Sequence, residues 1–246
     1  MALGLVVLVG WLGGRALFQS SIFVLTDIRI RGTHMATTRQ VLDLAGLQQG
    51  RSLLGFDADA AVKRIKSHPW IDEVEITTHW PSAVEIRVIE HQPFALVNVE
   101  AGERRRLHYM DASGRLFADA AQGKDLDYPV ITGVREGVDV KDGCFVPESA
   151  AAAAYKLLHL AAQGNAILPV QAISEVHADP DNGLIVYLVD RPFPIYFGAG
   201  NLRTKYFRLV KVLEQLYAKK QIDAVNDIRM DYLDDKVLVT GATVDE

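Results

Sequence analysis

The first 25 residues are apolar on every face of a helix, and Arg15 is the single charged side chain among them. A helix of this kind has no polar face to turn toward water. A bilayer core of about 30 Å needs about 20 residues at helical rise. Residues 1–22 are therefore predicted to form a transmembrane anchor, with Arg15 reaching toward one interface. The run begins at residue 2 without a basic flank, so we favour an uncleaved anchor over a cleavable signal peptide.

Three short runs between residues 23 and 89 alternate apolar and polar positions, which is the period of a strand with one buried face. They are FVLTDIRIR at residues 23–31, VEITT at residues 74–78 and VEIRVI at residues 84–89. The segment His79-Trp80-Pro81-Ser82 joins the last two and is rich in turn-forming residues. These two runs are therefore predicted to be antiparallel neighbours.

Two short helices are predicted between the first and second of these strands. Thr37-x-x-Gln40 has the form of a capping box, and Gly46 is placed to end the helix that it opens. Asp57 is placed to cap the next helix. The order over residues 23–92 is thus β-α-α-β-β.

Past residue 92 the pattern changes to short strands separated by glycine and aspartate, which predicts a second domain at residues 93–246. Asn182-Gly183 predicts a tight hairpin, because this pair supplies the positive φ angles of such turns. Residues 227–232 and 236–240 predict a final hairpin. This domain is expected to be mostly antiparallel.

Two helices are predicted within this second domain, at residues 148–163 and from Asn201 onward, because apolar residues recur there at helical spacing. The predicted buried face of the second helix consists of Tyr206, Leu209, Val210, Leu213 and Tyr217. The fold class is therefore α+β: an N-terminal transmembrane helix, a β-α-α-β-β domain, and a mostly antiparallel β-domain with two or more helices.

Composition narrows the class of function. The chain has 246 residues, and 49% of them are apolar, which is enough to build packed cores. Its 31 acidic and 26 basic residues give a net charge of −5, so nucleic acid is not expected as a partner. A single cysteine, Cys144, excludes an internal disulfide and a multi-cysteine metal cluster.

No motif predicts an enzyme. The seven histidines form no H-E-x-x-H pattern and are interpreted as surface or turn residues. Residues 179–182 lack the spacing of a calcium loop and predict a turn, and residues 198–201 lack the lysine of a phosphate loop. The arginines at 104–106 are interpreted as a strand edge protected by charge. We predict a binding protein with no metal, no cofactor and no small-molecule substrate.

An ordered set of motifs resembles the FtsQ/DivIB family of bitopic cell-division proteins. After the apolar segment and FVLTDIRIRG come His68-Pro69-Trp70-Ile71, Trp80-Pro81 and Glu90-His91-Gln92-Pro93, which are similar to that family's POTRA domain. The segment from Met110 to Phe117 is similar to the opening of the family's β-domain. The resemblance is close over about residues 22–133 and looser beyond.

The resemblance implies a role and a location. It implies a single-pass protein of the inner membrane at the division septum, with its C-terminal part in the periplasm. It implies a scaffold that links early and late components of the septum and binds the small bitopic proteins FtsB and FtsL. It also implies that the POTRA domain takes part in recruitment to the septum. The alternative is a POTRA-containing assembly or secretion factor of the outer membrane, although such proteins usually carry a barrel that this pattern lacks.

The predicted partner site is the final hairpin. A last strand has amide and carbonyl groups along one side that a partner strand can pair by β-augmentation. We predict that Arg229 contacts a partner carboxylate and that Met230 and Tyr232 are apolar anchors. Family members often carry an aromatic residue at the position of Met230, and alternation places Tyr232 on the same strand face. The predicted augmented edge consists of Val237, Leu238 and Val239.

Overall fold

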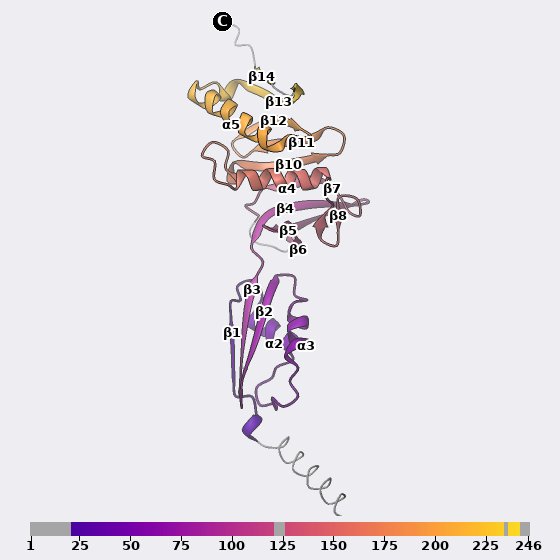
Figure 1. Ribbon diagram of the computed structural model, residues 1–246, viewed down its shortest axis with the longest axis vertical. Coiled ribbons are helices and arrows are strands. Elements are labelled where there is room, and N and C mark those ends of the chain that lie inside the picture. Colours follow the sequence, from indigo (N-terminus) through magenta and orange to yellow (C-terminus); the bar gives the residue numbers. More distant parts are fainter. Residues whose placement is uncertain (1–20, 121–125, 234–235, 242–246) are drawn as a thin grey trace, which may run out of the picture. The chain divides into compact units, whose positions relative to one another are not determined.

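The chain divides at His91–Gln92 into two units, each with its own sheet (Figure 1). The computed structural model describes residues 21–120, 126–233 and 236–241. The predicted transmembrane helix at residues 1–22 lies almost entirely outside these residues. Within the described ranges, no helix combines the length and the apolar character needed to cross a bilayer.

Unit 1 ends at His91 and contains a three-stranded sheet in the order β1-β3-β2. β1 runs parallel to β3, with Ile28 opposite Val84, and β2 runs antiparallel to β3. The predicted β-α-α-β-β order is confirmed. The elements are η1 (Ser21–Phe23), β1 (Asp27–Arg31), α2 (Thr38–Ala45), α3 (Ala58–Ile65), β2 (Ile71–His79) and β3 (Ala83–Glu90).

The helix caps of unit 1 form as the residue pattern predicts. Thr37 Oγ1 accepts a hydrogen bond from the Gln40 amide at 3.2 Å, and Gln40 Oε1 accepts one from the Thr37 amide at 2.8 Å. Gly46 ends α2 with a φ of 70°, a conformation that glycine adopts without steric cost. Asp57 accepts a hydrogen bond from the Ala60 amide at 3.0 Å at the start of α3.

The first strand is shorter than predicted. β1 begins at Asp27, whereas the alternation suggested a start at Phe23. Backbone groups of residues 23–25 pair instead with the loop after α2: the Leu53 amide donates to Phe23 O at 2.7 Å, and the Leu25 amide donates to Arg51 O at 2.8 Å. Leu25 is thereby buried in the core of the unit. Apolar alternation reports burial and does not tell which neighbour a strand pairs with.

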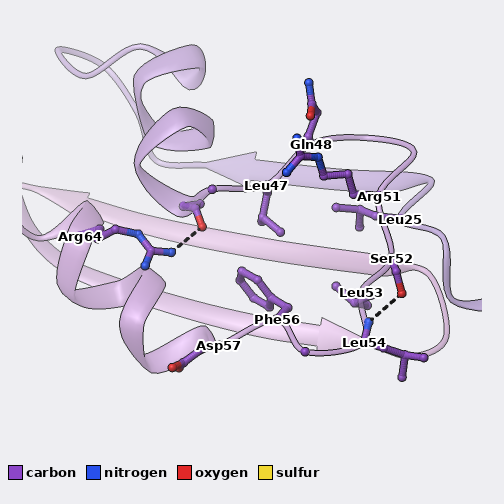
Figure 2. Close-up of a pocket in the computed structure, with 13 residues that line it drawn as sticks. Leu25, Leu47, Gln48, Arg51, Ser52, Leu53, Leu54, Phe56, Asp57 and Arg64 are labelled. Carbon is purple, nitrogen blue, oxygen red and sulfur yellow. Dashed lines mark hydrogen bonds between the residues drawn. The ribbon is translucent and has the colours of Figure 1, made fainter. Parts of the chain in front are cut away.

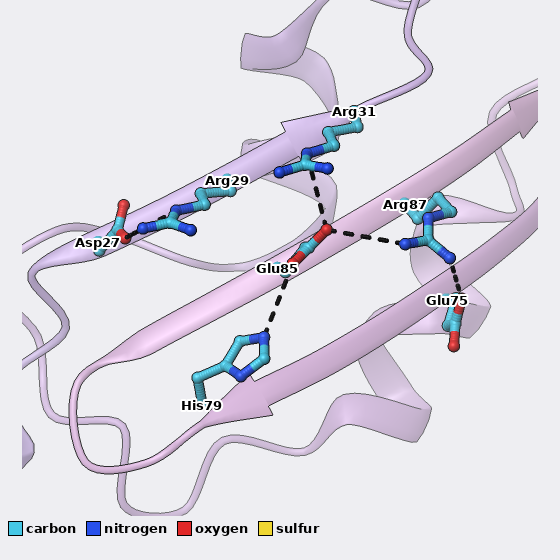
Figure 3. A network of polar contacts seen from close by, with 7 residues as sticks. All are labelled: Asp27, Arg29, Arg31, Glu75, His79, Glu85 and Arg87. Atoms are coloured by element: carbon cyan, nitrogen blue, oxygen red, sulfur yellow. Dashed lines mark hydrogen bonds and ion pairs between the residues drawn. The ribbon is translucent and has the colours of Figure 1, made fainter.

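Charged side chains cross-link the solvent face of this sheet (Figure 3). Glu85 on β3 lies 3.7 Å from Arg31 on β1, 3.7 Å from His79 on β2 and 3.9 Å from Arg87. Arg87 also lies 3.2 Å from Glu75 on β2. These opposite charges on neighbouring strands reinforce the pairing of all three strands.

Unit 2 begins at Gln92 and contains a nine-stranded sheet in the order β14-β13-β12-β11-β10-β7-β4-β5-β6, together with a small hairpin of β8 and β9. Its first strands are β4 (Pro93–Ala101), β5 (Arg104–Asp111), β6 (Leu116–Asp119), β7 (Val130–Arg135), β8 (Val140–Lys141) and β9 (Cys144–Phe145). There follow α4 (Ala150–Ala161), η3 (Val170–Ala172), β10 (Ile173–Asp179), β11 (Gly183–Leu188), β12 (Arg191–Gly198), α5 (Leu202–Ala218), η4 (Ile222–Ala224), β13 (Val225–Leu233) and β14 (Lys236–Gly241).

The sheet of unit 2 is mixed and mostly antiparallel, as predicted. Five of the eight neighbouring pairs of described strands are antiparallel. The pairs β4–β7, β7–β10 and β12–β13 are parallel. Parallel neighbours need a crossover between them, and α4 and α5 supply the crossovers that precede β10 and β13.

The core of unit 2 lies between the sheet and its two helices. α4 packs on β7, β10 and β11, and α5 lies beside α4 (Figure 1). Alternate residues of β12, namely Phe193, Ile195 and Phe197, point into this core. The predicted buried face of α5 is confirmed except at Tyr217, which is 39% exposed and has the guanidinium carbon of Arg191 5.9 Å from its ring centre.

Candidate partner-binding edge

β13 and β14 form the outermost hairpin of the large sheet. β13 is parallel to β12, with Ile195 opposite Ile228, and antiparallel to β14, with Ile228 opposite Val239. Apolar residues alternate with Asp227, Arg229 and Asp231 along β13. Ile228 and Met230 belong to the core of unit 2, and this alternation positions the charged set on the opposite face of the sheet.

The two edges of this sheet differ in what lies against them. β6 is one edge, and there the Leu116 amide donates to Gly143 O at 2.8 Å while Arg115 pairs with Cys144. β14 is the other edge. Among the described residues β13 is the single strand that pairs with β14. The backbone groups on the far side of β14 therefore have no strand partner in the described part of the chain.

The side chains of β14 suit a surface that another chain covers. Leu238 is 43% exposed and Val239 is 36% exposed. Val237 is half-buried and packs against the core of unit 2. The three residues predicted as the augmented edge thus lie together on β14. Val237 packs against the core, whereas Leu238, opposite Arg229, and Val239, opposite Ile228, are exposed on the two faces of the strand.

Arg229 is held on the helix-free face by two neighbours. Its guanidinium carbon lies 4.5 Å from the centre of the Tyr196 ring on β12, and its Nε lies 3.3 Å from Asp227 Oδ1. Thr240 on β14 donates a hydrogen bond to Asp227 Oδ2. The 3.3 Å contact has ion-pair distance without hydrogen-bond geometry, since Asp227 Oδ1 has no hydrogen-bond partner among the described residues. Arg229 is thus preorganised and still partly open to solvent.

The structure contradicts the predicted role of Met230 and does not test that of Tyr232. Met230 is 1% exposed and belongs to the core of unit 2, so its side chain does not form a surface anchor. The reason is the period of the strand: Met230 follows Ile228 by two residues and shares its inward face. The side chain of Tyr232 lies outside the described part of the structure, and its role stays a prediction.

Two residues of this site were not anticipated from the sequence. Tyr196 provides the ring beneath Arg229, and Asp227 links β13 to β14 through Thr240. β12 itself was not predicted, although Phe193, Ile195 and Phe197 alternate with polar or prolyl positions in the sequence. That alternation is the signal that identifies β12 and places Tyr196 on the face opposite the core.

Unit 1 contains a separate cavity of about 360 Å³ beside the loop that follows α2 (Figure 2). Leu47, Leu53 and Phe56 line it, and Arg64 donates hydrogen bonds to Leu44 O at 2.8 Å and to Ala45 O at 2.9 Å. Arg64 therefore satisfies carbonyl groups at the end of α2. This arrangement explains local structure and does not resemble a reaction centre.

Other groups with possible chemistry have structural partners. His91, interpreted as a surface or turn residue, is buried, and its Nε2 lies 4.0 Å from Asp72 Oδ1. Its position directly after β3 brings it under the start of β2, because its amide donates to Trp70 O at 2.9 Å. In the described ranges, no group of three or more histidine, cysteine or acidic side chains is arranged to hold a metal ion.

Comparisons with protein-family models match both units. Residues 23–91 match the POTRA domain of FtsQ type, and residues 95–234 match the C-terminal domain of the cell division protein FtsQ/DivIB. The second match begins within β4, includes β13 and stops before β14.

Similar proteins share most of the chain. The cell division protein FtsQ of Anaeromyxobacter sp. is 34% identical over 89% of this chain and 70% of its own length. FtsQ of Geotalea daltonii is 28% identical over 92% of this chain and 78% of its own length. A solved structure of POTRA1-2 from Anabaena Omp85 aligns at 16% identity with a TM-score of 0.26, over 33% of this chain and 55% of that chain, and is too dissimilar to bear on function. The chain belongs to the FtsQ/DivIB family of cell division proteins.

Proposed function

We propose that this protein is a bitopic membrane scaffold of the bacterial division complex, and that β14 is the strand to which a partner adds. The observation that carries the proposal is the open side of β14, with Leu238 and Val239 exposed beside it. A strand edge of this kind is a template for pairing with another chain. In this proposal the protein links other proteins and does not act as an enzyme.

The energetics of strand addition suit reversible assembly. β14 has six residues, and alternate residues of a strand direct their amide and carbonyl groups to the same side. Each added hydrogen bond contributes about 1 kcal/mol net. A few such bonds together with the burial of Leu238 and Val239 support a dissociation constant on the order of micromolar.

The proposed partners are the extracytoplasmic tails of FtsB- and FtsL-like proteins, which the family resemblance implies. Arg229 is proposed to exchange its contact with Asp227 for a carboxylate of the partner. Its stacking on Tyr196 supports this role, because the ring holds the guanidinium in place while its edge stays accessible. The partner strand then covers Leu238 and Val239.

The remaining parts of the chain complete the proposal. Residues 1–22 are proposed to anchor the protein in the inner membrane, with the rest of the chain in the periplasm at the division septum. Unit 1, which matches the POTRA model, is proposed to take part in recruitment of the protein to that site.

Lysine substitutions on β14 test the proposal. Leu238→Lys and Val239→Lys should each weaken binding of a synthetic FtsB-type tail to the detergent-solubilised full chain by about tenfold or more, which corresponds to roughly 1.4 kcal/mol. Isothermal titration calorimetry measures the affinity. Val138→Lys is the matched control, because Val138 is an exposed residue of unit 2 next to β7, five strands from β14. Equal affinities for all three variants, with unchanged thermal unfolding, would contradict the proposal.

Hydrogen exchange tests the backbone pairing itself. In the free protein, the amides of β14 that face β13 should exchange slowly and those on the open side should exchange fast. Addition of the tail should slow exchange at the second set. If the tail binds and these amides stay fast, it docks through side chains alone and strand addition is wrong.

A further inference from the structure

Exposed apolar side chains gather at the end of unit 1 where residues 21–23 enter it. Ile22 is 62% exposed and Trp80 is 59% exposed. The ring of Trp80 meets the ring of Phe23 edge to face, with their centres 6.1 Å apart. We call these three residues the tip surface. A cluster of large exposed apolar groups marks a contact site more often than a single exposed residue does.

Backbone hydrogen bonds fix the tip surface as one piece. The Thr26 amide donates to Ser82 O at 2.9 Å, which holds the turn after Trp80 against the entering chain. The Leu53 amide donates to Phe23 O, and the Leu25 amide donates to Arg51 O. Figure 1 shows η1 beside the end of the sheet at which β2 and β3 meet. The turn, the entering segment and the loop that carries the exposed Arg51 therefore meet at the same end of the unit.

The sequence before the tip surface indicates what covers it. The apolar run of residues 2–18 ends four residues before Ile22. Four residues span at most about 14 Å even when fully extended. The interfacial layer of a bilayer extends about 5–8 Å beyond each side of the hydrocarbon core. If the run lies in the membrane, even a fully extended connection carries the tip surface at most about 6–9 Å beyond the headgroup layer. The tip surface therefore stays close to the lipid headgroups.

We infer that the tip surface seats in the membrane–water interface, with Trp80 and Ile22 among the headgroups. This inference rests on the proposed membrane anchor, whose last residue is Ile22, and adds Trp80 as a second contact. Tryptophan is enriched at this depth of the bilayer because its ring is apolar and its N–H is polar. Unit 1 is then held to the membrane at two places and does not swing on a single tether.

Tryptophan quenching by brominated lipid tests this inference. The chain has Trp11 in the apolar run, Trp70 just before β2 and Trp80 just after it. β2 has nine residues, so Trp70 and Trp80 are separated by about 30 Å along the strand. Three variants of the full chain, each with two of these residues changed to Phe, are reconstituted into vesicles of phosphatidylcholine and phosphatidylglycerol. One set of vesicles is brominated close to the headgroup and a second set near the ends of the acyl chains, because Trp11 lies near the middle of the apolar run.

Each outcome is decisive. The expected result is a loss of Trp80 emission with the lipid brominated close to the headgroup, a loss of Trp11 emission with the lipid brominated near the acyl-chain ends, and no loss for Trp70 with either. Quenching of Trp11 without quenching of Trp80 overturns the inference and leaves the anchor in place. If Trp11 is not quenched either, the proposed anchor is wrong, and the tip contact falls with it. Trp80 that is shielded from iodide but not quenched by the lipid is covered by protein, which also overturns the inference.

A spin label provides a second readout that leaves the aromatic residues unchanged. Ile22→Cys in a Cys144→Ser background carries the label on the tip surface, and Met35→Cys in the same background is the control. Met35 is similarly exposed, and its amide bonds to Glu90 at the opposite end of β3. The label at position 22 should be more accessible to oxygen and less accessible to a water-soluble nickel chelate than the label at position 35. Equal accessibilities at the two positions contradict the inference.

Discussion

Asp179 shows how one side chain organises a hairpin turn. Its Oδ1 accepts the amides of Asp181 at 2.8 Å and Asn182 at 3.1 Å, and its Oδ2 accepts the Asn182 side-chain amide at 2.8 Å. These bonds, with the Asn182 side chain as the largest cause, hold the pKa of Asp179 below its ordinary value. Gly183 follows with a φ of 81°, and a Cβ there would lie 2.2 Å from the backbone of Gly198.

Removal of the largest of these donors should raise the pKa of Asp179. In Asn182→Ala the pKa of Asp179 should move toward that of an ordinary aspartate. Asn182→Ser retains a side-chain donor, so the pKa of Asp179 should rise less in that variant. A lowered pKa in the folded state contributes stability above the unfolded pKa, and this contribution is lost as pH falls through the folded pKa. The alanine variant should therefore lose less stability than the native chain when acidified. The pH dependence of the Asp179 carboxyl carbon shift measures the midpoint, and an unchanged midpoint contradicts the assignment.

The candidate site divides at the residue scale into parts that the sequence can predict and parts that it cannot. The burial of Met230 follows from its two-residue spacing from Ile228, whereas the family resemblance suggested a surface aromatic position there. The stacking of Arg229 on Tyr196 joins residues 33 positions apart across a parallel pair. Single-sequence alternation gives the face of each residue, but not which strands become neighbours.

At the scale of elements, the terminal hairpin combines a core strand with an edge strand. β13 contributes Ile228 and Met230 to the core, whereas β14 contributes the half-buried Val237 and the exposed Leu238 and Val239. The hairpin was predictable because both strands alternate and a polar link joins them. The position of β13 beside β12 was not predictable, because β12 itself was not predicted and α5 separates the two strands in the sequence.

Two truncations should separate binding from folding at this hairpin. Deletion of residues 236–246 removes β14 and should abolish partner binding with a modest loss of stability. Deletion of residues 227–246 also removes two core side chains, and loss of a large buried apolar side chain costs about 2–5 kcal/mol each. It should therefore lower the melting temperature of unit 2 far more. Circular dichroism measures both variants, and equal melting temperatures would show that β13 is not a core strand.

The short helices of unit 1 mark the opposite case, where local chemistry decides structure. The predicted caps form, because a cap depends on residues within four positions of one another. They involve Thr37, Gln40, Gly46 and Asp57. The pairing of residues 23–25 with the loop at 50–53 depends on distant partners and was missed. Local signals therefore predicted the helices, while the exact start of β1 required the structure.

At the scale of the whole molecule, each unit has a hydrophobic core of its own. Described core residues of unit 1 lie between Leu25 and Val88, and those of unit 2 lie between Phe94 and Val237. The order of motifs was sufficient to identify the family, because it depends on the sequence of elements and not on their contacts. The anchor remains a prediction from composition, since residues 1–20 lie outside the described ranges.

A reciprocal pair of core substitutions should reveal the independence of the units. Ile86 and Ile195 are both fully buried, one in each core. Ile86→Ala should destabilise unit 1 by about 2–5 kcal/mol and leave unit 2 within about 0.5 kcal/mol, and Ile195→Ala should do the reverse. Hydrogen exchange of strand amides in β3 and β12 measures the two free energies separately. Loss of protection in both units from either change would show that they unfold together.

β14 is the last of the described strands along the chain as well as outermost in the large sheet. A ribosome releases the N-terminal parts first, so every other strand of the sheet is available before β14 emerges. A partner strand docking on β14 has no template until residues 236–241 have been made, and a chain cut short by a premature stop before residue 236 never acquires one. The proposed site is thus completed after every other described strand of the sheet, and copies that stop before it are expected to be left out of the division complex.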